Sequence, residues 1–167
     1  FTLVNYALLG LASGFTLATA LAALAGASAL VPAFGIGALF FTFAGLISRS
    51  LSLVRNARLK PRSTVQTAIG IRHPKIAQRS MGFMGGSFNT REFFHGGSQA
   101  HVVRVRVGAW LFGFALPLVL VVSALFTRKA LFWDLAFIVQ MLGMGCERWL
   151  FFASARHPQN LYYQRAA

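Results

Sequence analysis

The stretch FTLVNYALLGLASGFTLATALAALAGASALVPAFGIGALFFTFAGLIS, residues 1–48, decides the fold of this chain. It contains no Lys, Arg, Asp or Glu, and Arg49 is the first charged residue. A helix of about 20 apolar residues crosses the hydrocarbon core of a bilayer, so the stretch is long enough for two crossings. It therefore predicts a membrane protein.

The composition of the whole chain agrees with a lipid environment. Of the 167 residues, 56% are hydrophobic and 11% are charged, whereas soluble domains carry about 25% charged residues. The 16 Lys and Arg against 3 Asp and Glu give a net charge of +13, which in a membrane protein is typical of basic loops that face anionic lipid. No nucleic-acid-binding motif accompanies this charge, so we expect no nucleic-acid partner.

Four apolar segments are predicted to span the membrane, at about residues 3–26, 31–54, 107–127 and 130–155. They predict an all-α membrane protein with a single transmembrane domain over residues 1–167 and a structured interfacial loop over 55–106. We expect a kink at Pro117, because proline removes one helical hydrogen bond. Trp133 and Trp149 are expected at the membrane interfaces. Because the chain starts inside an apolar run, we also expect further residues upstream.

The loop is expected to contain short interfacial helices. Ser63 and Gln66 fit a capping box at the start of one of them, and Gly70 fits its end. With four crossings, every Lys and Arg except Arg128 and Lys129 lies on the side of this loop, as does the C-terminus. The positive-inside rule then places the loop and the C-terminus in the cytoplasm and the protein in the inner (cytoplasmic) membrane.

The positions of His and Cys limit the cofactors that this chain can hold. No span contains a histidine, so the facing pair that ligates haem within a bundle is missing, and we expect no haem; the histidines are His73, His95, His101 and His157. Cys146 is the only cysteine, too few thiolates for an iron–sulfur cluster in this chain. No HExxH motif or nucleophile elbow occurs, so we expect no metal site and no catalytic residue.

One polar cluster at the membrane edge is a candidate quinone site. Its members are Arg91, Glu92, His95, Gln99 and His101, and phenylalanines flank it. A quinone head group needs apolar or aromatic walls, hydrogen-bond donors to its carbonyl oxygens and a titratable proton relay. In the alternative interpretation, Arg91 pairs locally with Glu92, the phenylalanines anchor an interfacial helix and the histidines are solvated.

Glu147 and Arg148 are charges close to the end of the fourth span, where charges are usually paired or functional. Neighbouring residues on a helix point about 100° apart, so these two are not expected to pair with each other. We expect both to make structural ion pairs, with an arginine of the long loop as a partner for Glu147.

Two stretches carry a family resemblance. The first is STVQTAIG at residues 63–70 with MGFMGGSFNTREFFH at 81–95. The second is ERWLFFA at 147–153, followed by ARH at 155–157 and NLYY at 160–163. These stretches resemble the membrane anchor family of dimethyl sulfoxide reductase. The resemblance implies an eight-helix anchor, of which the four spans here are the second half. It further implies an iron–sulfur partner subunit, a molybdopterin catalytic subunit and electron exchange with menaquinone or ubiquinone, without haem.

The resemblance also implies that the iron–sulfur subunit docks on the loop, with Arg72, His73, Lys75, Arg79, Phe88, Asn89 and Arg91 as candidate contacts. Because the loop is expected in the cytoplasm, it favours the relatives that oxidise sulfite and reduce quinone. Such an anchor does no bond chemistry on the soluble substrate and passes electrons between the iron–sulfur subunit and the quinone pool. The alternatives are a quinol-oxidising anchor of a dimethyl sulfoxide reductase, a membrane transporter and a purely structural anchor.

Overall fold

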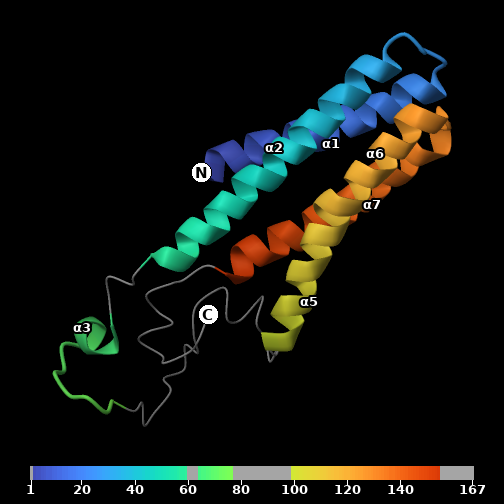
Figure 1. Ribbon diagram of the computed structural model, residues 1–167. Coiled ribbons are helices and arrows are strands. Elements are labelled where there is room, and N and C mark those ends of the chain that lie inside the picture. The colour runs from blue at the N-terminus through green and yellow to red at the C-terminus, as the bar shows by residue number, and fades with distance from the viewer. Residues whose placement is uncertain (1, 60–63, 77–98, 155–167) are drawn as a thin grey trace. The chain divides into compact units, whose positions relative to one another are not determined.

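The computed structural model describes residues 2–59, 64–76 and 99–154, which form helices and turns and contain no strand. The elements labelled in Figure 1 are α1 (Thr2–Leu24), α2 (Val31–Arg58), α3 (Val65–Ile69), α5 (Gln99–Trp110), α6 (Leu116–Thr127) and α7 (Ala130–Ala153), with a π-helical segment η1 (Leu111–Ala115) between α5 and α6. Four helical stretches are long and apolar enough to cross a membrane: Thr2–Leu24, Leu30–Arg58, Ala100–Thr127 and Ala130–Ala153. The predicted all-α membrane fold with four transmembrane helices is confirmed.

Two helices extend further toward the loop than expected. α2 continues to Arg58 rather than ending near Val54, and α5 begins at Gln99 rather than near Val107. The predicted ends of the spans were placed where the apolar residues stop. A helix can continue beyond that point as long as its backbone hydrogen bonds continue. Arginines are tolerated in these extensions because their long apolar stems let the charge reach water. The connection between α2 and α5 is therefore shorter than the predicted loop over 55–106.

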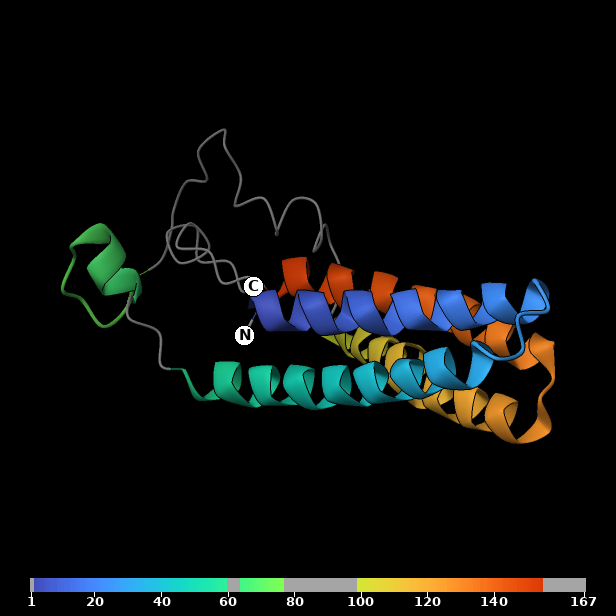
Figure 2. The same ribbon diagram turned by 90° about the horizontal axis from the view of Figure 1, so that it is seen from above.

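The chain divides into two compact units, one formed by residues 1–58 and 105–147 and the other by residues 59–104 and 148–167. In the first unit, α1 and α2 lie side by side and run in opposite directions in both views (Figures 1 and 2). A Schellman turn ends α1: the N–H of Ala27 donates to the carbonyl of Ala22 at 2.9 Å, and Gly26 has a φ of 70°. This turn reverses the chain without any charged residue.

Close contact between α1 and α2 depends on a glycine. A Cβ atom on Gly37 would lie 2.7 Å from the ring of Phe15, so only glycine leaves room for that ring. Phe15 also stacks on Phe41, with ring centroids 5.2 Å apart and planes inclined by 16°. Small residues at such crossings let membrane helices gain dispersion energy where the hydrophobic effect offers none.

The helices α2 and α7 run in the same direction and meet at three contacts spaced seven residues apart. Gly35 packs against Trp133, whose ring would lie 2.7 Å from an added Cβ. Thr42 accepts a hydrogen bond from the Gln140 amide at 3.0 Å. The third contact joins Arg49 to Glu147. A seven-residue repeat keeps one face of each helix toward the other, as in a left-handed supercoil.

The core of this unit consists mainly of small residues around one tryptophan. Trp133 is 1% exposed, and the buried cluster comprises Ala20, Ala38, Val121, Ala124, Trp133 and Ala136. The sequence predicted Trp133 at the membrane interface. Its ring instead lies inside the bundle. The physical reason is Gly35, whose missing side chain makes room for the indole inside the bundle.

The third membrane helix is interrupted by η1 just before Pro117. The N–H of Leu116 donates to the carbonyl of Leu111, a step of five residues instead of four. Proline has no N–H, so the α-helical hydrogen bonds cannot continue through it. The irregularity expected at Pro117 thus takes the form of a π turn. It lies close to α7, because a Cβ atom on Gly143 would overlap the backbone of Gly113.

In the second unit, α3 is a short helix with a cap at each end. The hydroxyl of Thr64 accepts from the N–H of Thr67 at 3.3 Å, and the hydroxyl of Thr67 accepts from the N–H of Thr64 at 2.8 Å. The predicted capping box at Ser63 and Gln66 was one residue too early. The box is formed by Thr64 and Thr67, with the Thr67 hydroxyl in the role expected of the Gln66 amide. Gly70, with a φ of 73°, ends the helix as predicted.

Candidate functional site

The predicted quinone cluster falls mostly outside the described residues. Arg91, Glu92 and His95 lie there, and Gln99 is described only as the first residue of α5. His101 is exposed, and its ring meets that of Trp149 edge-on, with centroids 5.2 Å apart and planes inclined by 84°. An exposed histidine beside an aromatic wall has the chemistry that a quinone carbonyl and its proton need. The cluster as a whole stays a prediction.

The predicted docking surface is described in part. Arg79, Phe88, Asn89 and Arg91 lie outside the described ranges, whereas Arg72, His73 and Lys75 are all exposed. The turn that carries them is held by the N–H of Lys75, which donates to Nδ1 of His73 at 3.0 Å. Exposed positive charge on a defined turn steers the approach of an acidic partner and adds to the rate of encounter.

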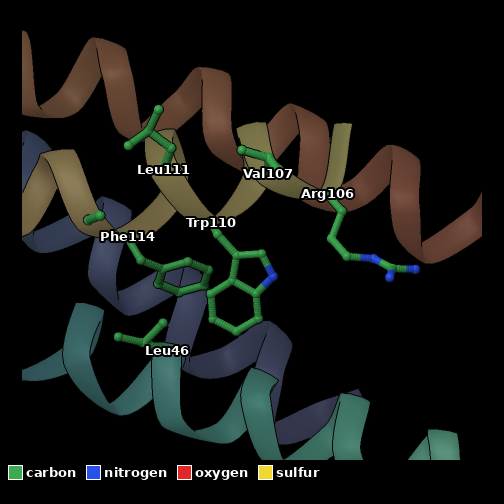
Figure 3. A pocket seen from close by; sticks show the side chains of 7 residues that line it. Leu46, Arg106, Val107, Trp110, Leu111 and Phe114 are labelled. Carbon is green, nitrogen blue, oxygen red and sulfur yellow. The ribbon is translucent and has the colours of Figure 1, made fainter. Parts of the chain in front are cut away.

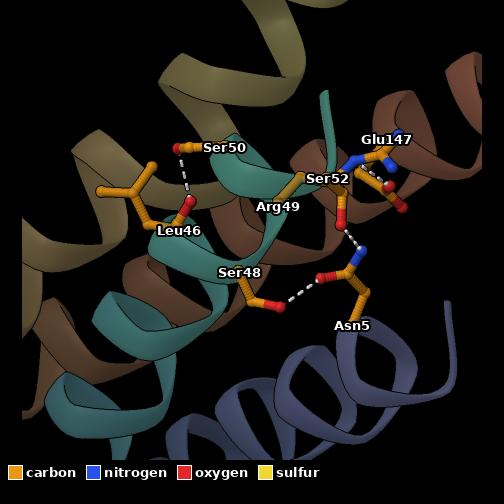
Figure 4. A network of polar contacts seen from close by, with 7 residues as sticks. All are labelled: Asn5, Leu46, Ser48, Arg49, Ser50, Ser52 and Glu147. Atoms are coloured by element: carbon orange, nitrogen blue, oxygen red, sulfur yellow. Dashed lines mark hydrogen bonds and ion pairs between the residues drawn. The ribbon is translucent and has the colours of Figure 1, made fainter. Parts of the chain in front are cut away.

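A buried ion pair joins α2 to α7 within the first unit (Figure 4). Nε of Arg49 lies 2.8 Å from Oε1 of Glu147, and the two residues are 8% and 2% exposed. One partner of Glu147 thus comes from a membrane helix, and the expected partner from the long loop stays a prediction. Two charges inside a bundle are costly to desolvate, and their attraction compensates only when they stay in contact. The pair therefore fixes the register between α2 and α7.

A second buried polar contact joins α1 to α2 at the same level of the bundle (Figure 4). Ser48 donates to Oδ1 of Asn5 at 2.6 Å, and Nδ2 of Asn5 donates to Ser52 at 2.9 Å. One asparagine reaches both serines because residues four apart share one face of a helix. All three side chains are buried, and within lipid an unpaired polar group would be costly. α2 is therefore fixed to α1 on one face and to α7 on another.

Arg148 has a different environment from its neighbour. Its guanidinium carbon lies 5.4 Å from the ring centroid of Phe151, a cation–π contact within the second unit.

Metal ligands are not gathered in the described part of the chain, where no three His, Cys, Asp or Glu side chains lie together.

An apolar groove runs beside η1 on the first unit (Figure 3). It has a volume of about 420 Å³ and is lined by Leu46, Arg106, Val107, Trp110, Leu111, Phe114 and Ala115. The guanidinium of Arg106 lies at one end of the lining residues, and Phe114 and Leu46 lie toward the other. Apart from Leu46 of α2, the lining comes from two adjacent stripes of α5 and η1, because residues four apart lie above one another on a helix.

Sequence reasoning did not single out Arg49, Leu46, Arg106 or Trp110. Arg49 was visible as the residue that ends the charge-free run, but its partner follows only from the packing of α2 on α7. The groove could not be predicted, because it combines α2 with a helix whose local geometry is π rather than α. A tryptophan one turn after an arginine was the available signal of a membrane interface.

The chain is similar along nearly all of its own length to a protein of Allochromatium vinosum that is named as a sulfite dehydrogenase subunit. The two are 49% identical over 166 residues, and the match covers 99% of this chain and 51% of that protein. No family model matches the chain, and no solved structure matches it. The chain thus spans about half the length of the sulfite dehydrogenase protein that it resembles.

Proposed function

We propose that this chain is part of the membrane anchor of a molybdopterin and iron–sulfur oxidoreductase that oxidises sulfite and reduces quinone. The observation that carries the proposal is the similarity of nearly the whole chain to one of the proteins that make up a sulfite dehydrogenase. The four transmembrane helices and the exposed basic turn at Arg72, His73 and Lys75 support it.

The chemistry assigns this chain a transfer role. Oxidation of sulfite to sulfate with water releases two electrons and two protons, and reduction of quinone to quinol consumes the same number of each. The catalytic and iron–sulfur subunits would handle the soluble half of this balance. This chain would hold the quinone at the membrane edge, and its titratable side chains, such as His95 and His101, would pass protons between water and the quinone oxygens.

A genetic test compares two electron acceptors. Membranes from cells that lack this protein are expected to lose sulfite-dependent reduction of a soluble quinone analogue, while sulfite oxidation with ferricyanide persists in the cytosol. If the membranes without the protein reduce the quinone analogue at the parental rate, the proposed function is wrong. If dimethyl sulfoxide, rather than sulfite, is the substrate whose turnover is lost, the direction of electron flow is reversed.

Two substitutions separate quinone binding from docking. His95→Ala is expected to lower sulfite-dependent quinone reduction while ferricyanide-dependent turnover persists, and Lys129→Ala, in the turn between α6 and α7 and outside both candidate sites, serves as the control. Arg91→Ala is expected to release the soluble subunits from the membrane, and Lys129→Ala, in the turn between α6 and α7, should not. Unchanged membrane retention of the catalytic activity in Arg91→Ala would contradict the docking surface.

A further inference from the structure

The apolar groove beside η1 has no role in the proposed function, and its lining points to a different ligand. Among the residues that line it, Arg106 is the only charged one, and the Trp110 indole carries the only other polar side-chain group. A quinone ring deeper in the groove would therefore meet Leu46, Phe114 and Ala115, which offer its carbonyls no side-chain donor. The lining instead suits a long apolar chain that ends in an anion.

The direction and length of the groove match one leaflet of a bilayer. Arg106, Trp110 and Phe114 form one stripe along the helix, and Val107, Leu111 and Ala115 form the next. From the first to the last of these residues the helix rises by roughly 13 Å. Half of the hydrocarbon core is about 15 Å thick, which is the depth that one acyl chain fills. An acyl chain lying along the groove would thus run parallel to the helix, as lipid chains do.

The polar end of the groove lies at the depth expected for a head group. Arg106 belongs to the first turns of the membrane-crossing stretch Ala100–Thr127, and both Arg106 and Val107 are exposed. Trp110 follows one turn later, and tryptophan is enriched at the membrane interface. An arginine at this level attracts a phosphate group, and basic sites between membrane helices are suited to anionic lipids.

The groove also owes its form to η1, which supplies Leu111, Phe114 and Ala115. A π turn widens the helix, and π segments occur frequently at functional sites. Here Phe114 is turned into the bundle and is 2% exposed, whereas Leu111 and Ala115 stay exposed along the groove. The buried ring of Phe114 therefore forms the bottom of the groove, and the exposed side chains of Leu111 and Ala115 form its side.

We propose that this groove binds one anionic phospholipid, with an acyl chain along Val107, Leu111 and Phe114 and the phosphate at Arg106. The site is independent of the proposed function, because it rests on the geometry and charge of the groove alone. Charge decides the head group, since a zwitterionic lipid fills the groove equally well but gains less at Arg106.

The test measures the lipid that stays bound to the full-length protein. The protein is extracted from membranes in mild detergent, in the assembly in which it exists there, and washed with detergent. The retained phospholipids are then identified and counted per chain by mass spectrometry. One arginine near the membrane surface contributes about 1 kcal/mol, so we expect about fivefold less anionic phospholipid on Arg106→Gln than on the wild type.

Three variants make the result specific. Arg106→Lys keeps the charge and should retain the lipid, which separates charge from folding. Ala115→Leu keeps Arg106 but fills the groove, and it should also reduce retention. Arg58→Gln removes an exposed arginine elsewhere and should change nothing. Equal retention by wild type and Arg106→Gln, equal amounts of anionic and zwitterionic lipid, or an isoprenoid quinone as the retained molecule would each overturn the proposal.

Discussion

Replacing Glu147 with leucine should destabilise the bundle strongly, because it removes the counter-charge of a buried arginine. Arg49 is 8% exposed, Glu147 is 2% exposed, and their Nε and Oε1 atoms are 2.8 Å apart. At an effective dielectric constant of about 20, two unit charges about 4 Å apart attract each other by about 4 kcal/mol. Measured losses on removal of one member of a buried pair are about 3–5 kcal/mol, and we expect Glu147→Leu to fall in this range.

The assay is a double-mutant cycle on the free energy of unfolding, measured by titration of the protein from mild micelles into a denaturing detergent. Glu147→Leu, Arg49→Met and the double variant are compared with the wild type. The double variant should lose less stability than either single variant, because two apolar side chains can replace a buried pair at little net cost. Arg58→Met, an exposed position on the same helix, should change the free energy by less than about 0.5 kcal/mol.

Two outcomes would refute this reasoning. If the losses of the two single variants add up in the double variant, the charges do not stabilise the bundle through each other. If Glu147→Leu loses less than about 1 kcal/mol, the pair is worth no more than a surface salt bridge, despite its burial. Glu147→Gln should fall between wild type and Glu147→Leu, because its amide oxygen keeps a partial negative charge beside the Arg49 guanidinium.

Three further predictions concern packing, polar contacts and sidedness. Gly143→Ala should destabilise the bundle by about 3 kcal/mol or more, because the new Cβ meets the backbone of η1, whereas Gly145→Ala, which meets no atom, should be neutral or stabilising in thermal unfolding. Asn5→Ala should lower the free energy of unfolding by about 1 kcal/mol in the same detergent titration. In a variant without the native cysteine, Lys129→Cys should react with an impermeant thiol reagent added to intact cells, and Lys75→Cys should react only after lysis.

Each of these predictions has an outcome that contradicts it. Equal thermal stability of the two glycine variants would mean that the helices can separate locally without cost. A loss for Asn5→Ala no larger than that for Ser13→Ala, whose hydroxyl bonds only to carbonyls of its own helix, would mean that the contact between α1 and α2 adds nothing. Labelling of Lys75→Cys in intact cells would reverse the orientation inferred from the charge distribution.

The four membrane helices could be predicted from the sequence because an apolar run of about 20 residues has few alternatives. The end of α3 at Gly70 could be predicted for a local reason, since a residue with positive φ favours glycine. The start of α3 was misplaced by one residue, because Ser63, Thr64, Gln66 and Thr67 offer two overlapping capping patterns. Local signals therefore gave the ends of α3 to within one residue, whereas the start of α5 lies about two turns before the predicted limit.

Contacts between helices could not be read from the sequence. Glu147 was expected to pair, but Arg49 is its partner only because α2 and α7 run in the same direction with matching seven-residue spacing. Trp133 was expected at the membrane interface. It lies in the core because Gly35, far away in the sequence, leaves room there for its ring. The groove needs the π turn in addition, and nothing in the residues around Pro117 specifies a π turn over a simple kink.

The surplus residue in η1 has a geometric consequence for the whole start of the third membrane helix. Deleting one residue between Leu111 and Ala115 would restore a regular α-helix and rotate every residue before it by about 100° about the helix axis. Arg106 and Val107 would then point away from Leu46. The one extra residue in this helix thus determines which side chains before η1 face α2.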